Sequence, residues 1–390
     1  MVRRLDRVNA LPVRGGLAQL DIEGIRDWLL ASLRELSVAT NIEAIVPVAH
    51  GAAAVLLDGD DAIAAIDYET SIPAEVASKY DAERDDFEAT LSPRLPAGLN
   101  LGAQLFWLER LFPNLWPARG QVSLWPQYWA SFLCGEAACE VTSLGCHTDL
   151  WRPLEHRFSD LANRRGWAER VGPLRRADDT LGVIRGSIAA ETGLSPRCRV
   201  YCGLHDSNAA LYAARGLSEL QDRPFSVVST GTWFVCLNAG SQAQVRYDPN
   251  QDMLANVDVE GRPVPTARFM GGRDYETWMG DTLGAQSDAN LLGQARETVG
   301  HSSQDPRLRA TQASLELARR TDHALTLIAA EGPILVEGRF ADDAAFGPAL
   351  AHLRPAQPVF RSSLADGVAL GALRLVSGRL FSPPALERFT

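Results

Sequence analysis

The 390-residue chain has few cysteines and no long apolar run. Its six cysteines are far below the density of a disulfide-stabilised scaffold, and no two of them form a C-x-x-C pair. We therefore expect a reducing, cytoplasmic environment in which the thiols act as small buried side chains. No run of about 18 apolar residues occurs, so we expect no membrane-spanning helix. The charged residues 1–7 also argue against a signal peptide.

Positive charge is scarce as well. The chain carries 38 basic and 48 acidic residues, a net charge of −10, which argues against nucleic acid or an anionic membrane surface as a partner. The motifs G-x-x-x-x-G-K-[ST], G-x-G-x-x-G, H-E-x-x-H and G-x-S-x-G are absent. Their absence counts against a P-loop protein, a Rossmann dehydrogenase, a zincin and an α/β-hydrolase. An acidic chain can still bind a polyphosphate through loop N–H groups and a metal ion.

The length and the hydrophobic pattern predict an α/β protein of two domains. A chain of 390 residues exceeds one compact core, and we place the domains at residues 1–197 and 198–390. Apolar residues at helical spacing predict a helix that begins after the N-cap Asp21. A strand over residues 44–49 then ends in His50 and Gly51. Polar residues at strand ends are where α/β folds place their sites.

Two short segments carry the strongest indication of chemistry. Residues 201–210 form a predicted strand that ends in a His-Asp pair and opens a helix, whose N-terminus favours the ionised form of Asp206. A carboxylate within reach of a hydroxyl can serve as a general base. Residues 225–233 form a predicted strand broken by Ser-Thr-Gly-Thr, a turn that offers donors to phosphate oxygens. Together the segments indicate phosphoryl transfer to an alcohol, whereas taken singly Asp206 could be only an N-cap and the turn only a hairpin.

In this order along the chain, the segments resemble the FGGY family of carbohydrate kinases. The resemblance rests on residues 205–210 and 229–233, a glycine-containing strand end near 338, a Gly-Ala-rich helix over 366–376, and Ala49-His50-Gly51. It continues over residues 104–108, where Gln104 stands in place of the family's lysine. It implies a two-domain, actin-like (ribonuclease-H-like) α/β fold. The amino-acid sequences of residues 145–151 and 268–273 are most similar to those of L-fuculokinases and rhamnulokinases.

The resemblance also implies roles for single residues. It makes Asp206 the base that deprotonates the sugar and His205 a neighbour that contacts sugar hydroxyls. The implied sugar pocket is His50, Gly51, Asp67 and Glu69, and the implied nucleotide contacts are Thr230, Gly231, Thr232, Gly338 and Asp342. As alternatives, His50 could be a core histidine, and Asp67 and Glu69 could be solvated strand ends. His147 and Asp149 stay open between subgroup contacts and helix-end polar residues.

The implied activity is ATP-dependent phosphorylation of a monosaccharide with Mg²⁺. The alternative is a non-catalytic sugar- or nucleotide-binding protein derived from such a kinase. One departure is large, because the family's first phosphate loop, Asp-x-Gly-x-Thr, is not found in the sequence. We therefore expect an incomplete N-terminal domain, through a misassigned start or a natural truncation, and weak or absent activity. The expected partners are the sugar and ATP, with a homodimer left open.

Overall fold

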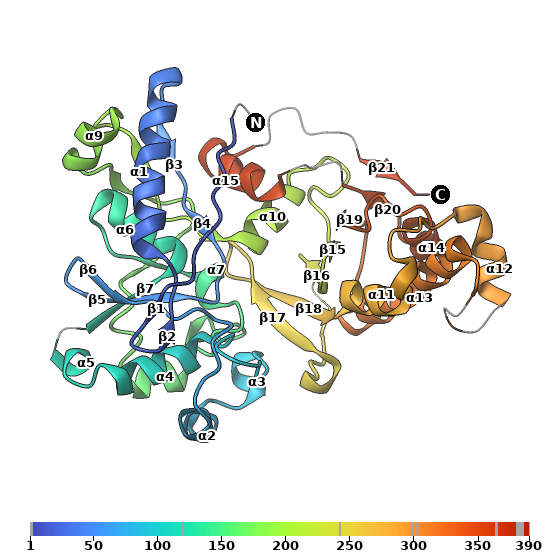
Figure 1. Ribbon diagram of the computed structural model, residues 1–390, viewed down its shortest axis with the longest axis horizontal. Coiled ribbons are helices and arrows are strands. Elements are labelled where there is room, and N and C mark those ends of the chain that lie inside the picture. The colour runs from blue at the N-terminus through green and yellow to red at the C-terminus, as the bar shows by residue number, and fades with distance from the viewer. Residues whose placement is uncertain are drawn as a thin grey trace. The chain divides into compact units, whose positions relative to one another are not determined.

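The computed structural model describes residues 3–118, 120–241, 243–297, 300, 303–362, 366–379 and 386–389. The chain folds into two compact units (Figure 1). Unit 1 comprises Met1–Ala209, Val257–Arg262 and Leu375–Gly378, and unit 2 comprises Ala210–Asn256, Pro263–Arg374 and Arg379–Thr390. Within the described ranges, no helix is both long and apolar enough to cross a bilayer.

The N-terminal helix of unit 1 forms where the sequence predicts it. Helix α1 spans Ile22–Ala39, and the side chain of Asp21 caps it by accepting the Gly24 N–H at 3.1 Å. The predicted N-cap is thereby confirmed.

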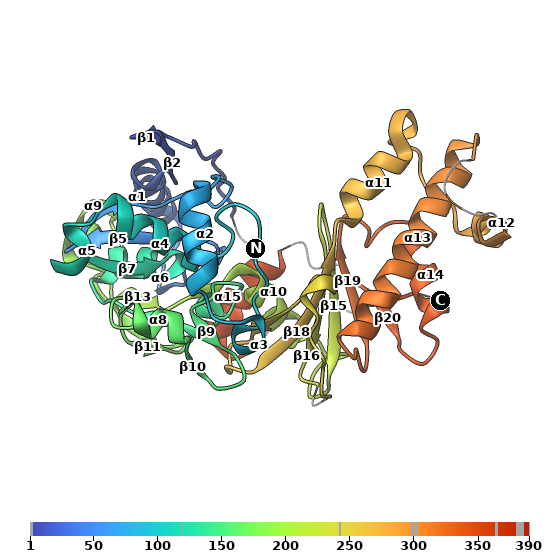
Figure 2. The same cartoon turned by 90° about the horizontal axis from the view of Figure 1, so that it is seen from below.

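One of the sheets of unit 1 has three strands, of which β5 and β7 are labelled in Figure 2. Its order is β6-β5-β7, with β5 at Ala54–Asp58, β6 at Asp61–Ala64 and β7 at Gly120–Leu124. Alternate residues of β5 face opposite sides, as the pleat requires. Leu56 packs in the cluster that contains helix α4, Leu101–Leu111, whereas Val55 packs in the cluster that contains α6, Trp125–Cys134.

Two interrupted strands run parallel beside each other in unit 1. The first consists of β3, Ala44–Ile45, and β4, Val48–Ala49; the second consists of β13, Arg199–Tyr201, and β14, Leu204–His205. The predicted strand over residues 44–49 is thus present but broken at Pro47, which has no N–H to donate. The carbonyl of Pro47 accepts the Leu204 N–H at 3.2 Å. β13 and β14, which follow the predicted domain boundary at residue 197, belong to unit 1.

Shorter elements complete unit 1. The helices are α2 Ala74–Glu83, α3 Phe87–Thr90, α5 Leu115–Ala118, α7 Val141–Leu144, α8 Asp160–Arg164 and α9 Gly186–Thr192. The strands are β1 Val13–Arg14, β2 Leu17–Ala18, β8 Cys139–Glu140, β9 Trp151–Arg152, β10 Arg157–Phe158, β11 Leu174–Arg175 and β12 Thr180–Val183.

Unit 2 is built on a mixed seven-stranded sheet of order β17-β18-β16-β15-β19-β20-β21. The strands are β15 Phe225–Thr230, β16 Phe234–Ala239, β17 Met253–Val257, β18 Pro263–Phe269, β19 Ile334–Gly338, β20 Val359–Arg361 and β21 Glu387–Arg388. The central β15 pairs antiparallel with β16 and parallel with β19. The 3₁₀ turns are Pro249–Gln251, Gly280–Thr282 and Ala289–Leu291.

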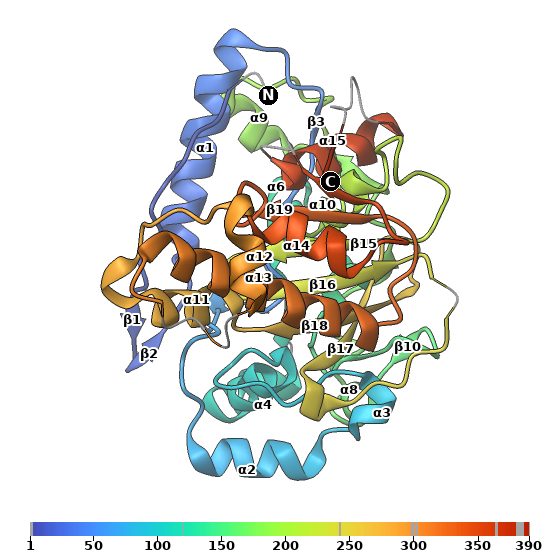
Figure 3. The ribbon, with the colours of Figure 1, turned by 90° about the vertical axis from the view of Figure 1, so that its right-hand side faces the viewer.

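Helices cover both faces of this sheet. Val228 packs in the cluster that contains α13, Pro306–Leu327, and α14, Phe346–Leu353. Figure 3 views the unit from the side of these two helices. Val227 packs on the opposite face, in the cluster that contains residues of α10, Asp206–Ala214, and α15, Gly367–Ser377. The remaining helices are α11 Gly271–Met279 and α12 Leu292–Glu297.

All six cysteines are free, and five of them are buried. Burial raises the pKa of the Cys146 thiol, and the negative charge of Asp206 adds to this effect. The prediction that the thiols are small buried residues is confirmed for all but Cys134, which is half-buried.

The turn between β13 and β14 predicts a stability effect. Gly203 has φ +75°, and a Cβ at this position would overlap the carbonyl oxygen of Pro47. We expect Gly203→Ala to lower the free energy of unfolding by about 2 kcal/mol or more, measured by urea denaturation. Gly186→Ala is the matched control, because a Cβ there meets no atom within 4 Å and φ is not positive. Equal losses in the two variants would contradict the prediction.

Candidate functional site

The parallel pairing of β4 with β14 creates one shared strand edge in unit 1. Leu204 lies opposite Val48, and His205 lies opposite Ala49. The next residue of each strand, His50 and Asp206, therefore leaves the pair at the same edge. A Cβ at Gly51 would lie 3.1 Å from Cδ2 of His205, so the backbone after His50 passes directly beside the His205 ring.

The carboxylate of Asp206 accepts the backbone N–H of Ser207 at 2.6 Å and lies beside the ring of His205. Oδ1 of Asp206 lies 3.2 Å from Nε2 of His205, and the amide nitrogen of Asn208 lies 3.1 Å from Nδ1. Because a carboxylate only accepts, Nε2 carries the proton and Nδ1 accepts from Asn208. The Asp206 side chain is 41% exposed, so it is accessible to a substrate hydroxyl. Both ring nitrogens of His205 are engaged, and the sugar contact predicted for this residue stays a prediction.

Burial keeps the two histidines of this edge neutral. It lowers the pKa of His205 and of His50, and the charge of Asp206 opposes the shift in both. The ring of His50 packs edge-on against Tyr68, with centroids 5.4 Å apart, and lies 6.4 Å from the Trp125 ring. His50 is therefore a neutral group that lies near two aromatic rings.

Asp67 and Glu69 flank Tyr68 just after β6. The Asp67 side chain is buried, and burial followed by the charge of Glu69 raises the pKa of its carboxyl. Burial first, and then the charges of Glu69, Asp67 and Asp206, raise the pKa of Tyr68. The charge of Asp206 acts on both Tyr68 and His50, so these two residues lie near the predicted base.

A buried acid anchors the strand that carries the His-Asp pair. The hydroxyl of Thr142 donates to Oε2 of Glu140 at 2.6 Å and accepts the backbone N–H of His205 at 3.0 Å. Glu140 also caps α7 by accepting the Ser143 N–H at 3.1 Å. Its side chain is fully buried, and burial raises the pKa of its carboxyl to about 7, against the hydrogen bonds from Thr142 and Ser143.

In unit 2, the predicted phosphate loop is the turn between β15 and β16. The Thr230 hydroxyl donates to the Glu337 carbonyl at 2.6 Å and accepts the Phe340 N–H at 2.9 Å, so it ties β15 to the end of β19. Gly231 and Thr232 form the turn itself, and Thr232 is exposed. The Thr232 carbonyl accepts the N–H of Gly272 at 3.1 Å, which brings the first turn of α11 against the loop.

Asp342 lines a cavity of about 300 Å³ in unit 2, and Gly338 is the residue before Arg339, which also lines it. Gly338 pairs with Thr230 in the parallel ladder and has φ +84°. Its Cβ would overlap the Thr230 carbonyl oxygen, so the close approach of β19 to β15 requires glycine. Asp342 lines the cavity with Tyr275 and Arg339, and its exposed carboxylate lies 3.2 Å from the Arg361 guanidinium.

The two residues left open by the sequence have local partners. Asp149 is buried and pairs with Arg84 through two hydrogen bonds of 2.9 and 3.0 Å. It also accepts from the Tyr80 hydroxyl. Nδ1 of His147 lies 2.9 Å from the Leu99 carbonyl oxygen. Asp149 therefore has a structural role in unit 1.

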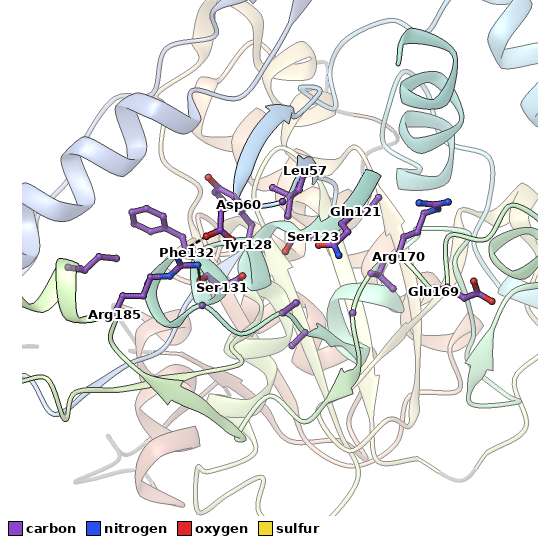
Figure 4. Close-up of a pocket in the computed structure, with 18 of the residues that line it drawn as sticks. Leu57, Asp60, Gln121, Ser123, Tyr128, Ser131, Phe132, Glu169, Arg170 and Arg185 are labelled. Atoms are coloured by element: carbon purple, nitrogen blue, oxygen red, sulfur yellow. Dashed lines mark hydrogen bonds and ion pairs between the residues drawn. The ribbon is translucent and has the colours of Figure 1, made fainter. Parts of the chain in front are cut away.

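A hollow of about 380 Å³ in unit 1 is lined by none of the predicted site residues (Figure 4). Asp60 and Arg185 form an ion pair of 3.0 Å on its wall. Tyr128, on the same wall, stacks on Trp125 with ring centroids 5.9 Å apart, and Trp125 in turn lies beside His50.

Within the described ranges, no group of three or more His, Cys, Asp or Glu side chains is placed to hold a metal ion. Mg²⁺ is commonly bound by one or two carboxylates together with the phosphates of a nucleotide. The described residues form no cage of their own for this ion.

Comparison with known proteins identifies the family. Residues 222–301 and 290–383 match the model of the FGGY carbohydrate kinase C-terminal domain. The crystal structure of a carbohydrate kinase from Novosphingobium aromaticivorans is 40% identical and superimposes with a TM-score of 0.91, covering 99% of this chain and 92% of that one. The chain belongs to the FGGY family of carbohydrate kinases. The predicted two-domain, actin-like α/β fold is confirmed.

More distant FGGY structures share this fold. Xylulose kinase from Rhodospirillum rubrum is 18% identical with a TM-score of 0.74, covering 95% of this chain and 83% of that one. Plasmodium falciparum glycerol kinase with ADP is 10% identical with a TM-score of 0.72, at the same coverage of 95% and 83%. A xylulose kinase from Staphylococcus epidermidis is 25% identical over 192 residues, 49% of this chain. This match spans only 35% of that relative's length. The fuculokinase- and rhamnulokinase-like subgroup stays a prediction.

Sequence reasoning missed the residues that support this FGGY site. Asn208 sits three residues after His205, the spacing of one helical turn, which could have pointed to it. The segment from Glu140 to Trp151 is too polar for a core helix, and this polarity was the available signal for Glu140 and Thr142. No sequence signal placed Tyr275 beside Asp342, because only the fold brings them to one cavity.

The buried acid predicts a pH dependence of stability. With a pKa of about 7 in the folded state and an ordinary value of 4.5, Glu140 holds a proton that the unfolded chain releases. Stability should therefore fall as pH rises from about 4.5 to about 7. In the wild-type protein, deprotonation of Glu140 should lower the free energy of unfolding by on the order of 3 kcal/mol between about pH 5 and pH 8. We expect Glu140→Gln to abolish this decrease, as measured by urea denaturation at both pH values.

The matched control is Glu136→Gln, which changes an exposed carboxylate nearby. This control should keep the wild-type slope of stability against pH. An unchanged slope in Glu140→Gln would contradict the assignment of the buried proton to Glu140.

Proposed function

We propose that this protein transfers the γ-phosphoryl group of ATP to a hydroxyl of a monosaccharide, with Asp206 as the general base. The observation that carries the proposal is the parallel pairing of β4 with β14, which brings His50 and Asp206 to one strand edge. The backbone N–H of Ser207 donates to Oδ1 of Asp206 at 2.6 Å, Nε2 of His205 lies 3.2 Å from the same oxygen, and the Asp206 side chain is 41% exposed. A carboxylate so held can accept the proton that the sugar hydroxyl loses as the phosphoryl group arrives.

The surroundings of Asp206 suit a polyhydroxylated substrate. Tyr68 and Trp125 offer ring surface on either side of His50, and Asp67 and Glu69 offer acceptors to sugar hydroxyls. Small-molecule sites combine apolar walls with a few placed polar groups in this way. His50, Gly51, Asp67 and Glu69 are the sugar-pocket residues of the proposal, and His205, beside the base, is a further contact of the sugar hydroxyls.

On the nucleotide side, we assign the turn at Gly231 and Thr232 to the β- and γ-phosphates. Its exposed hydroxyl and the N-terminus of α11 beside it are suitable donors for phosphate oxygens. The cavity lined by Tyr275, Arg339 and Asp342 would bind the adenosine. Gly338 lets the end of β19 approach the end of β15 closely. Thr230 supports this loop from beneath. Mg²⁺ would arrive bound to ATP and neutralise phosphate charge.

The test is release of ADP from ATP and Mg²⁺ with a panel of L-fuculose, L-rhamnulose, L-ribulose and D-xylulose. We expect slow ADP release with at least one sugar, because the first phosphate loop is not found in the sequence. Asp206→Asn should lower kcat by a factor of roughly 10² or more, because the proton acceptor is lost. Binding of the sugar, measured by calorimetry, should be largely retained. Asp27→Asn is the matched control, since Asp27 is an exposed acid of α1 outside the site.

Two results would count against this assignment. Full turnover by Asp206→Asn would remove Asp206 from the role of base. Sugar binding without ADP release by the wild-type protein would favour the alternative, a non-catalytic binding protein.

A further inference from the structure

Unit 2 contains a cavity of about 400 Å³ that the proposed reaction does not use. It lies between the starting turn of β17, the end of β18 and the middle of α13. Three arginines line it, Arg268 from β18 and Arg319 and Arg320 from α13, against the two carboxylates Asp252 and Glu316. Cations therefore outnumber anions on this wall, although the whole chain has a net charge of −10.

Two of the arginines on this wall, Arg268 and Arg319, have only distant carboxylate partners. Arg268 approaches Asp252 at 3.5 Å, and Arg319 approaches Glu316 at 3.6 Å. Charge-assisted hydrogen bonds between such groups are usually about 2.7–2.9 Å long. The Arg268 side chain is only 14% exposed, and among the described residues its buried Nε finds no acceptor. Burial lowers the pKa of Arg268, with Asp252 opposing, so this guanidinium lacks the compensation that a buried cation requires.

The remaining arginine is held in place. Arg320 forms an ion pair of 2.5 Å with Asp274 of α11, and its guanidinium stands 4.6 Å from the centre of the Phe269 ring. Arg268 is likewise fixed, 4.8 Å above the Trp233 ring. Donors that are already oriented lose little entropy when an anion binds, which favours affinity.

We propose that this cavity is a binding site for a small ligand that carries a phosphate group. Guanidinium groups from two different elements, β18 and α13, can donate to several oxygens of one tetrahedral anion. The volume exceeds that of a bare ion and suits a small phosphorylated metabolite. None of the residues assigned to the sugar, the base or the nucleotide lines this cavity, so the site stands independently of the proposed reaction.

Occupation of this site has a built-in reporter. The carbonyl of Trp233 accepts the Gly231 N–H at 3.0 Å and so closes the turn that holds Thr232. Trp233 is 38% exposed and its ring lies under Arg268. An anion that pairs with Arg268 weakens this cation–π contact, so the fluorescence of Trp233 should change when the ligand binds.

The test is calorimetric titration of the full chain with inorganic phosphate at constant ionic strength. We expect saturable binding that Arg319→Gln weakens about tenfold or more. Arg319 is half exposed, so its replacement should not affect folding. Arg307→Gln is the matched control, because Arg307 is an exposed cation of α13 outside the cavity. Trp233→Phe should abolish the fluorescence change and retain binding.

A further variant separates this site from the proposed phosphate loop. Thr232→Val should leave the affinity for inorganic phosphate unchanged. Three outcomes would overturn the proposal: no heat beyond that of chloride at equal ionic strength, equal weakening by Arg307→Gln and Arg319→Gln, or binding that Thr232→Val abolishes while Arg319→Gln retains it.

Discussion

The pairing of two short parallel strands is the constraint on which the site in unit 1 depends. β4 and β14 contribute two residues each to this ladder, and neither could hold its position alone. The hydrogen bond from Leu204 to the carbonyl of Pro47 sets the register where both strands are interrupted. A slip by one residue would turn the side chains to the opposite face. The placement of His50 beside Asp206 is therefore a property of register.

A second layer of buried polar groups fixes this register. Thr142 both donates and accepts, and it connects the backbone of His205 to the carboxyl of Glu140. In a low dielectric, an unsatisfied member of such a chain costs more free energy than the satisfied contact contributes. The strand end that carries Asp206 is therefore rigid, because any other position of this strand would leave buried polar groups without hydrogen-bond partners. Rigidity of this kind suits a general base such as Asp206, whose carboxylate must be positioned accurately against the hydroxyl that loses its proton.

Local sequence signals predicted the fold well where one element suffices to define it. The N-cap at Asp21, the strand over residues 44–49 and the helix opened by Asp206 were all visible in the pattern. The pattern did not predict the interruption of this strand at Pro47, nor its pairing with β13 and β14, because those strands lie far along the chain. The same limit applied to the site. Asp206 could be proposed from its place at a strand end, whereas Glu140 and Thr142 act through a contact that only the folded chain creates.

The close packing around Gly51 has a consequence for the thiols. Cys146 lies so near to Gly51 that a Cβ there would overlap its sulfur, and the thiol is fully buried with a raised pKa. Reaction with a thiol reagent requires an exposed thiolate. The Cys146 thiol therefore does not react while the packing around Gly51 is intact. The rate at which a thiol reagent modifies Cys146 therefore reports how often local opening exposes this part of unit 1.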